Sequence, residues 1–240
     1  MKTTKSKQND TRRAILNSAV DLITEQGYDK TTMKQIARAA EVGDATVYKY
    51  FPTKEKLLLG YYEEVIADVL KNTAALPEVD QYTLHERLHL LIDGVLEGML
   101  GDREFVAITR SLVGRSALLM HAGMPGRTAL KQEVAALLEQ AEQRGEIAAC
   151  DFKAMLAGLF PDYLFSVVLY WLDDESEEFA NTTQLVELTL GVLVLVLKSG
   201  LVDKVSELIG FLVRGQMARL MQHGSGLLGM LEVARRRTGQ

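Results

Sequence analysis

The chain has 240 residues, of which 48% are apolar and 25% charged, and its formal net charge is −5, values ordinary for a soluble globular protein. The single cysteine, Cys150, excludes an internal disulfide framework and a cysteine-rich zinc module. The longest apolar stretch, 188–197, falls short of the roughly 20 residues that a membrane span needs. No apolar segment follows the basic N-terminus, so we expect a cytoplasmic protein without membrane contact.

Charge is divided unevenly along the chain. Residues 1–56 carry 11 Lys and Arg against 7 Asp and Glu, a local net charge of +4. The rest of the chain carries 16 basic and 25 acidic side chains, a net charge of −9. Such asymmetry suggests a module that meets a polyanion, attached to one that does not.

The apolar spacing is helical from the start of the chain. A first helix is expected to present one apolar face, formed by Ile15, Ala19, Leu22 and Ile23, and to end at Gly27. Thr32 and Gln35 form a capping box, which predicts the beginning of a short second helix.

A third short helix is expected over 44–50, after a break at 41–43. Val47 and Phe51 are its apolar anchors, and Pro52 ends it. Thr53 then caps a fourth helix that extends to about residue 71. This fourth helix is expected to couple the N-terminal part of the chain to the rest.

Helical spacing continues through the remainder of the chain. Beyond a linker at 76–80, helices are expected at 84–99, 103–121, 127–144, 152–173 and 179–199, and 201–240 adds one or two more. No segment alternates convincingly with a period of two. The sequence therefore predicts an all-α fold, in which an N-terminal three-helix helix-turn-helix domain precedes a larger helical body.

Two short helices joined by a three- or four-residue break have the geometry of a helix-turn-helix. With the two anchors turned inward, the third helix exposes Ala45, Thr46, Tyr48, Lys49 and Tyr50. A small residue allows close approach to the major groove, and phenol and ammonium groups suit phosphate oxygens. The alternative is a plain helical hairpin with surface aromatics, which explains the crowding of Tyr and Lys poorly.

The stretch 11–58 resembles the DNA-binding domain of the TetR family of transcriptional regulators. The matching segments are GY at 27–28, TTMKQIA at 31–37, AEV at 40–42, TVYKYF at 46–51 and KEKL at 54–57. The resemblance implies a sequence-specific regulator that binds a palindromic DNA operator as a homodimer, represses transcription, and is released by a small molecule in its C-terminal body.

Carried over position by position, the resemblance also assigns DNA contacts. Residues at positions that touch bases or nearby phosphates are Lys34, Asp44, Ala45 and Lys49, and residues at backbone-contact positions are Thr32, Thr46, Tyr48, Tyr50 and Lys54. Two positions depart from the family pattern. Glu41 replaces a common glycine, so we expect that no positive φ is needed there. Asp44 replaces a basic or neutral residue, and we hypothesise that it accepts from a cytosine N4 donor and sets specificity.

The chain is accordingly divided into a DNA-binding domain at 1–56, a connecting helix at 57–75 and a ligand-binding and dimerisation domain at 76–240. Helices 152–173 and 179–199 are expected to form the dimer interface, because the second is apolar on too many sides for a monomer surface. A mostly apolar pocket for a lipid-like or aromatic effector is expected between body helices. Its candidate lining residues, each of which could also be plain core, are Phe105, Ile108, Leu112, Met120, Met155, Leu159 and Tyr163.

An alternative is raised by residues 85–89, which spell the H-E-x-x-H signature of zinc peptidases. His85 and His89 share a helix face, and Glu86 could polarise a zinc-bound water. A third ligand at a familiar spacing is missing. The chain is therefore expected to be neither an enzyme nor cofactor-dependent, while a zinc-dependent hydrolase or a metal-responsive protein using the two histidines remains the second hypothesis.

Overall fold

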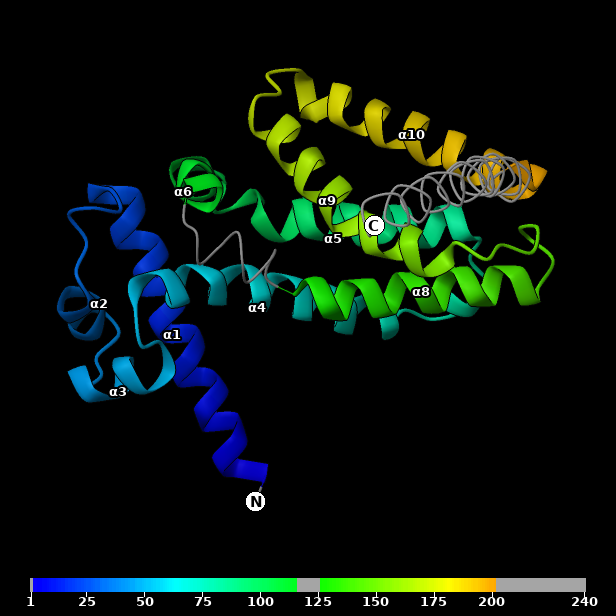
Figure 1. Ribbon diagram of the computed structural model, residues 1–240. Helices are drawn as coiled ribbons and strands as arrows, with labels where there is room; N and C mark the ends of the chain where they lie inside the picture. Colours follow the sequence, from blue (N-terminus) through cyan, green and yellow to red (C-terminus); the bar gives the residue numbers. More distant parts are fainter. Residues whose placement is uncertain (1, 116–125, 202–240) are drawn as a thin grey trace, which may run out of the picture.

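The computed structural model describes residues 2–115 and 126–201, and these residues form helices joined by short turns, without any strand (Figure 1). The predicted all-α fold is confirmed. The predicted helix ends agree with the described ones within a few residues, apart from the end of the 103–121 helix and the segment 202–240, which lie outside the described residues.

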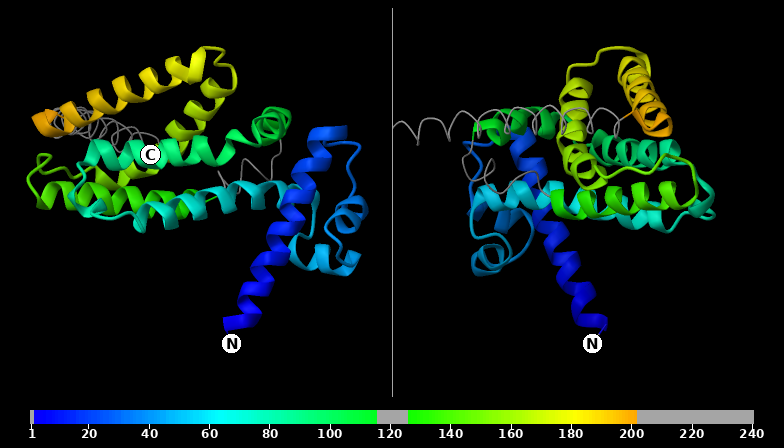
Figure 2. Two further views of the ribbon diagram at one scale, coloured as in Figure 1. Left: turned by 180° about the vertical axis from the view of Figure 1, so that it is seen from behind. Right: turned by 45° about the vertical axis from the view of Figure 1, so that its right-hand side comes forward.

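The N-terminal head contains α1 (Lys2–Gln26), α2 (Met33–Ala39) and α3 (Asp44–Tyr50). Gly27 adopts a φ of 85°, the left-handed conformation that ends a helix at low cost for glycine. The first turns of α1 project away from the rest of the head (Figures 1 and 2). The head core is built from fully buried side chains of all three helices, Ile15, Ala19, Ile23, Ile36, Ala37 and Val47.

The helix α4 (Lys54–Ala74) leaves the head and enters the body, where it packs along α5 (Leu84–Leu100) (Figure 1). Thr53 caps α4 as predicted, since its side chain accepts a hydrogen bond from the Lys56 amide. A short 3-10 turn, η1 (Val79–Gln81), lies between the two helices. The helix α4 therefore belongs to both parts and is the continuous connection between them.

The body is completed by α6 (Arg103–Arg115), α8 (Arg127–Gln143), α9 (Lys153–Leu172), the 3-10 turn η2 (Glu177–Phe179) and α10 (Ala180–Ser199). The helix α8 packs mainly on α9, and α10 packs on α5. The helices α9 and α10 follow each other as a hairpin at the edge of the body (Figure 2). The core therefore runs continuously from the head through α4 into the body.

By length and composition alone, two helical segments, Lys153–Leu172 and Glu177–Ser199, could cross a membrane, with mean hydropathies of 1.5 and 1.6. Both pack into the helical body. Only one face of α10 is covered within the chain. Its outer face exposes three apolar side chains at i, i+4 and i+7, Leu188, Val192 and Leu195.

Candidate functional site

The turn between α2 and α3 sets the angle of the helix-turn-helix. The predicted capping box is present: the Thr32 side chain accepts from the Gln35 amide, and the Gln35 carboxamide oxygen accepts from the Thr32 amide at 2.8 Å. In the turn, Glu41 has a φ of 54°. The expectation that this position avoids a positive φ was therefore wrong, and a non-glycine residue sits in the left-handed region at a cost in backbone strain.

The helix α3 is held by its inner face and presents its outer face to solvent. Val47 is fully buried and Phe51 nearly so, as their spacing predicted. On the outer face Asp44, Ala45, Tyr48 and Lys49 are exposed. This face has a small residue at its first turn and a phenol and an ammonium group beyond it, the kinds of side chain that a helix facing a major groove carries.

Two residues expected on the exposed side of α3 are only partly exposed. Thr46 and Tyr50 are of intermediate burial, and the Tyr50 ring packs beside that of Phe51 with centroids 6.5 Å apart. The ring of Tyr50 therefore belongs in part to the head core, which fixes the direction of its hydroxyl group. Lys34 of α2 and its N-cap residue Thr32 are exposed.

Lys54 was expected to contact the DNA backbone, but its ammonium group is engaged within the head. The Nζ donates to the carbonyl oxygens of Tyr28 at 2.6 Å and Thr31 at 2.9 Å, and it lies 4.0 Å from the centre of the Tyr28 ring. Lys54 thus ties the α1–α2 loop to the start of α4. Burial, with a further contribution from neighbouring Glu55, raises the pKa of the Tyr28 phenol to about 12.

Polar contacts join α4 to α1 in the head and to the start of α6 in the body. On the head side, Arg13 donates to Glu64 at 2.8 Å and to Asp68 at 2.6 Å. On the body side, the Tyr61 hydroxyl donates to Asp102 Oδ2 at 2.9 Å, and the ring of Tyr61 packs edge-on against Phe105. Burial and the Asp102 carboxylate both raise the pKa of the Tyr61 phenol, which therefore stays protonated as a donor.

The body contains an apolar cavity of about 310 Å³, lined by α5, α8, α9 and α10 and open on one side. Its lining residues are Leu88, Val134, Leu138, Leu156, Leu159, Phe160, Tyr163, Thr189, Leu190, Leu193 and Leu197. The polar side chains in this lining are Tyr163 and Thr189, which hydrogen-bond each other, while the Thr189 hydroxyl donates to the Leu185 carbonyl at 2.7 Å. The cavity suits an apolar ligand with few polar atoms.

Two of the predicted pocket residues, Leu159 and Tyr163, line this cavity. Met155 of α9 is 53% exposed and lies outside the lining, as do the α6 residues Phe105, Ile108 and Leu112. Met120 falls outside the described residues. Sequence reasoning missed the contributions of α5, α8 and α10, since each of those leucines and valines reads as ordinary core until the helices are placed together.

Comparison with known proteins identifies both parts of the chain. Residues 15–61 match the family model described as bacterial regulatory proteins, tetR family. Residues 87–212, more than half of the chain, match the model described as tetracyclin repressor-like, C-terminal domain. The chain belongs to the TetR family. It is a DNA-binding helix-turn-helix regulator of transcription rather than an enzyme.

Several TetR-type relatives resemble the chain at low identity. An uncharacterized HTH-type transcriptional regulator of Mycobacterium tuberculosis is 31% identical over 152 residues, 62% of this chain and 72% of its own length. The fatty acid metabolism regulator protein of Bacillus subtilis is 29% identical over 104 residues, which cover 43% of this chain and 53% of that protein. The crystal structure of FadR from Bacillus subtilis in complex with stearoyl-CoA shares the fold, with a TM-score of 0.56, 24% identity and coverage of 74% and 97%.

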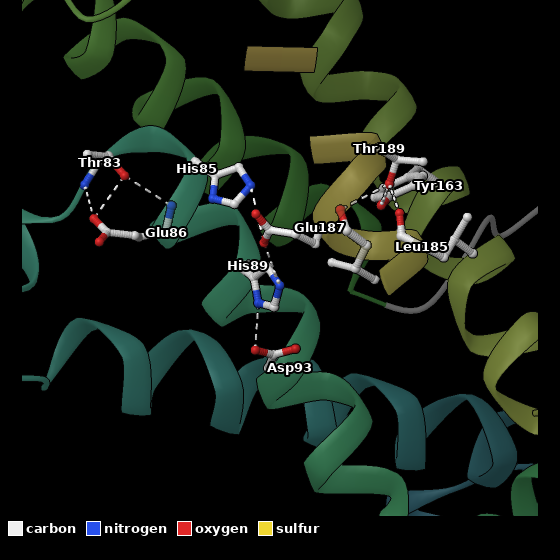
Figure 3. A network of polar contacts seen from close by, with 10 residues as sticks. Thr83, His85, Glu86, His89, Asp93, Tyr163, Leu185, Glu187 and Thr189 are labelled. Carbon is white, nitrogen blue, oxygen red and sulfur yellow. Dashed lines mark hydrogen bonds and ion pairs between the residues drawn. The ribbon is translucent and has the colours of Figure 1, made fainter. Parts of the chain in front are cut away.

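The H-E-x-x-H segment of this TetR-family chain does not form a peptidase site. Glu86 closes a capping box at the start of α5, where its Oε2 accepts from the Thr83 amide at 2.7 Å and the Thr83 hydroxyl at 2.8 Å. These hydrogen bonds lower the pKa of Glu86. Figure 3 shows this carboxylate held toward Thr83, while the two histidines point toward α10. The hydrolase alternative is therefore rejected.

Proposed function

We propose that the protein is a homodimeric repressor that binds a palindromic operator through α3 and leaves it when an apolar ligand fills the body cavity. The observation that carries this proposal is the outer face of α3, where Asp44, Ala45, Tyr48 and Lys49 stand exposed over the buried anchor Val47. The division into a head at 1–56, a connecting helix at 57–75 and a body at 76–240 is retained within this proposal, as is a cytoplasmic location.

Dimerisation is proposed through α9 and α10. The stripe of Leu188, Val192 and Leu195 on α10 is 60%, 61% and 67% exposed, and Tyr170 of α9 is also exposed. A second copy packed as a four-helix interface would remove this apolar surface from water. Two heads held in this way need their α3 helices one DNA turn apart, roughly 34–36 Å, or a multiple of it, to reach successive major grooves.

The effector is proposed to carry a long acyl chain. Its support is the cavity lining, in which aliphatic side chains surround a single Tyr163–Thr189 hydrogen-bonded pair. The relatives agree with this chemistry, since one is named a fatty acid metabolism regulator and the FadR structure contains stearoyl-CoA. An acyl chain loses about 0.8 kcal/mol of unfavourable hydration per buried methylene, which suffices for tight binding once several are enclosed.

We propose that α4 carries the structural change from the ligand site to the head and so causes release from DNA. The first half of α4 is tied to Asp102, just before α6, by the Tyr61–Asp102 bond, and to α6 itself by a 2.8 Å contact between the hydroxyls of Tyr62 and Thr109. A ligand that shifts these helices changes the separation of the two heads. About 1.4 kcal/mol of preference for the non-binding state is enough for tenfold induction.

The DNA part is tested by selecting fragments from a random pool and measuring their affinity by fluorescence anisotropy at several salt concentrations. We expect a palindrome, two chains per site, and an affinity for all sequences that falls in Tyr48→Ala and Lys49→Ala. Selection of no sequence, or undiminished binding by both variants, would refute the placement of the head.

The ligand part is tested by calorimetric titration with stearoyl-CoA, using free coenzyme A as the matched control without an acyl chain. We expect one acyl-CoA per chain, no binding of coenzyme A alone, and release of the selected DNA. Leu193→Trp narrows the cavity from α10 and is expected to weaken acyl-CoA binding while DNA affinity is kept. Equal binding by this variant would place the effector elsewhere.

A further inference from the structure

The two histidines of α5 face one carboxylate of α10. His85 and His89 lie one helical turn apart, and their Nε2 atoms are 3.6 Å and 3.7 Å from the same Oε2 atom of Glu187. Figure 3 shows the Glu187 side chain reaching between the two rings from the neighbouring helix. Three groups that ligate transition metals therefore meet at the α5–α10 contact, from residues that are distant in sequence.

The hydrogen bonding of His89 leaves its Nε2 without a hydrogen when the ring is neutral. Its Nδ1 is 2.7 Å from Asp93 Oδ2, and an ionised carboxylate can only accept, so Nδ1 carries the hydrogen. The Nε2 lone pair then faces a Glu187 oxygen that also has only lone pairs to offer. A carboxylate behind the distal ring nitrogen is the usual second layer of support for a metal-bound histidine.

The Nε2 atom of His85 also lacks a hydrogen-bond partner among the described residues. This atom is buried, although the rest of the ring is partly exposed. A buried polar atom without a partner is uncommon and calls for a missing proton, water or ion. A cation between the two Nε2 atoms and Glu187 would satisfy all three groups at once.

We propose that His85, His89 and Glu187 form a site for a divalent transition metal such as Zn²⁺, with Asp93 as a positioning residue. Metal–ligand bonds of about 2.0–2.1 Å at tetrahedral angles place neighbouring donor atoms about 3.4 Å apart. The two Nε2–Oε2 separations lie close to that value. Two imidazoles and one carboxylate favour zinc-like ions over Mg²⁺ or Ca²⁺, which prefer oxygen ligands.

The proposed site has to close around the ion when it binds. As they stand in the described part of the chain, no three His, Cys, Asp or Glu side chains are arranged to hold a metal ion. Histidines four residues apart on a helix reach one metal ion through rotation of their side chains. Glu187 is 61% exposed and is free to follow. Water would take the fourth position.

Such an ion would cross-link α5 and α10, two of the helices that line the body cavity. Leu88 of α5 and Leu190 of α10 both line that cavity; Leu88 is adjacent to His89 in sequence, and Leu190 follows Glu187 by three residues. Binding to the folded state stabilises it in proportion to the metal concentration. The metal therefore acts on the stability of the ligand-binding body, independently of whether the effector is an acyl compound.

The test uses the full chain, freed of any polyhistidine tag and treated with a chelator. Titration with Co²⁺ is followed by its visible absorption, and Zn²⁺ affinity is measured by competition. We expect one tetrahedral site per chain, a rise in Tm with Zn²⁺, and a loss of affinity of at least tenfold in His85→Gln, His89→Gln and Glu187→Gln. In Asp93→Asn we expect a loss of about 10- to 100-fold.

Glu97→Gln removes a carboxylate elsewhere on α5 and serves as the matched control, expected to bind like the parent chain. Circular dichroism of each metal-free variant separates loss of a ligand from loss of folding. Absence of tetrahedral Co²⁺ absorption, or affinity unchanged in both His89→Gln and Glu187→Gln, overturns the proposal. In that case the cluster is a network of ion pairs and hydrogen bonds only.

Discussion

The ring of Phe51 lies directly against the backbone of Gly60, so that a Cβ built on Gly60 would come within 2.5 Å of a ring carbon. The carbonyl of the same glycine accepts a hydrogen bond from Arg12 at 3.2 Å. This contact fixes the end of α3 to α4 and thereby sets the direction in which α3 faces. A side chain at position 60 has to push the ring, and with it the end of the recognition helix.

Gly60→Ala is therefore expected to destabilise the protein by about 1–3 kcal/mol, as overpacking of a filled core does. Urea denaturation measures this loss, and DNA affinity is expected to fall with it. Gly158→Ala is the matched control, because a Cβ there meets only the end of the Lys131 side chain, at 4.0 Å. A Gly60→Ala variant as stable as the control would contradict the packing argument.

Glu41→Gly is expected to stabilise the head. The φ of 54° at Glu41 costs an L-residue about 1–2 kcal/mol, while glycine gives back part of that gain through its more flexible unfolded chain. The net effect is expected at about 0.5–1 kcal/mol in favour of the variant, measured as a shift in the urea midpoint. Glu41→Val, whose branched side chain tolerates this region poorly, is expected to move the midpoint the other way.

Lys54 and Lys49 are expected to differ in how their replacement changes the salt dependence of DNA binding. Lys54→Met leaves the carbonyls of Tyr28 and Thr31 without their charged donor, and should cost about 1–3 kcal/mol of stability. Lys49→Met removes an exposed cation and should lower the slope of log Kd against log salt by about 1. A reduced slope in Lys54→Met would show that this lysine binds phosphate after all.

Asp44→Asn tests the origin of sequence preference. Asp44 is exposed in the first turn of α3, where a carboxylate can accept from a cytosine N4 donor. We expect the variant to lose about 1–3 kcal/mol of discrimination at one position of each half-site, with little change elsewhere. Repeating the selection of DNA fragments with the variant measures this change. An unchanged operator sequence would contradict a role of Asp44 in specificity.

Stability is expected to fall in acid through Asp174. Its two carboxylate oxygens accept from the side chains and amides of Ser176 and Thr182, which holds the pKa of Asp174 well below its ordinary value. A lowered pKa in the folded state gives stability that is complete above the unfolded pKa of about 4 and is lost as the pH falls below it. Asp174→Asn should unfold more easily at neutral pH and show a flatter dependence between about pH 4 and 2.

Much of this fold could be predicted from the sequence, because its determinants are local. The Thr32–Gln35 capping box, the stop at Gly27 and the anchors Val47 and Phe51 each act within a few residues. The left-handed Glu41 was missed although the common glycine at that position was itself the signal. The engagement of Lys54 had no signal, since its carbonyl partners become neighbours only when α4 folds back on the α1–α2 loop.

The body sites were harder to predict for the same reason. The cavity draws one wall from each of four helices, and the apolar spacing within any one helix does not distinguish a cavity wall from a packed core. Phe105 was one of the predicted pocket residues, but it packs on Tyr61 of α4 instead. Glu187 completes the histidine pair from a distant helix, so no motif spacing could indicate it.

Some basic side chains of the head are already paired within the protein, and this pairing affects nonspecific binding to DNA. Arg12 and Arg13 are held by carboxylates of α4, and Lys54 by backbone carbonyls, so these three of the 11 basic residues in 1–56 are occupied before any phosphate arrives. Residence on random DNA grows with each phosphate that a protein neutralises. We therefore expect this head to remain on unrelated sequences for shorter times than it would if these three cations were free.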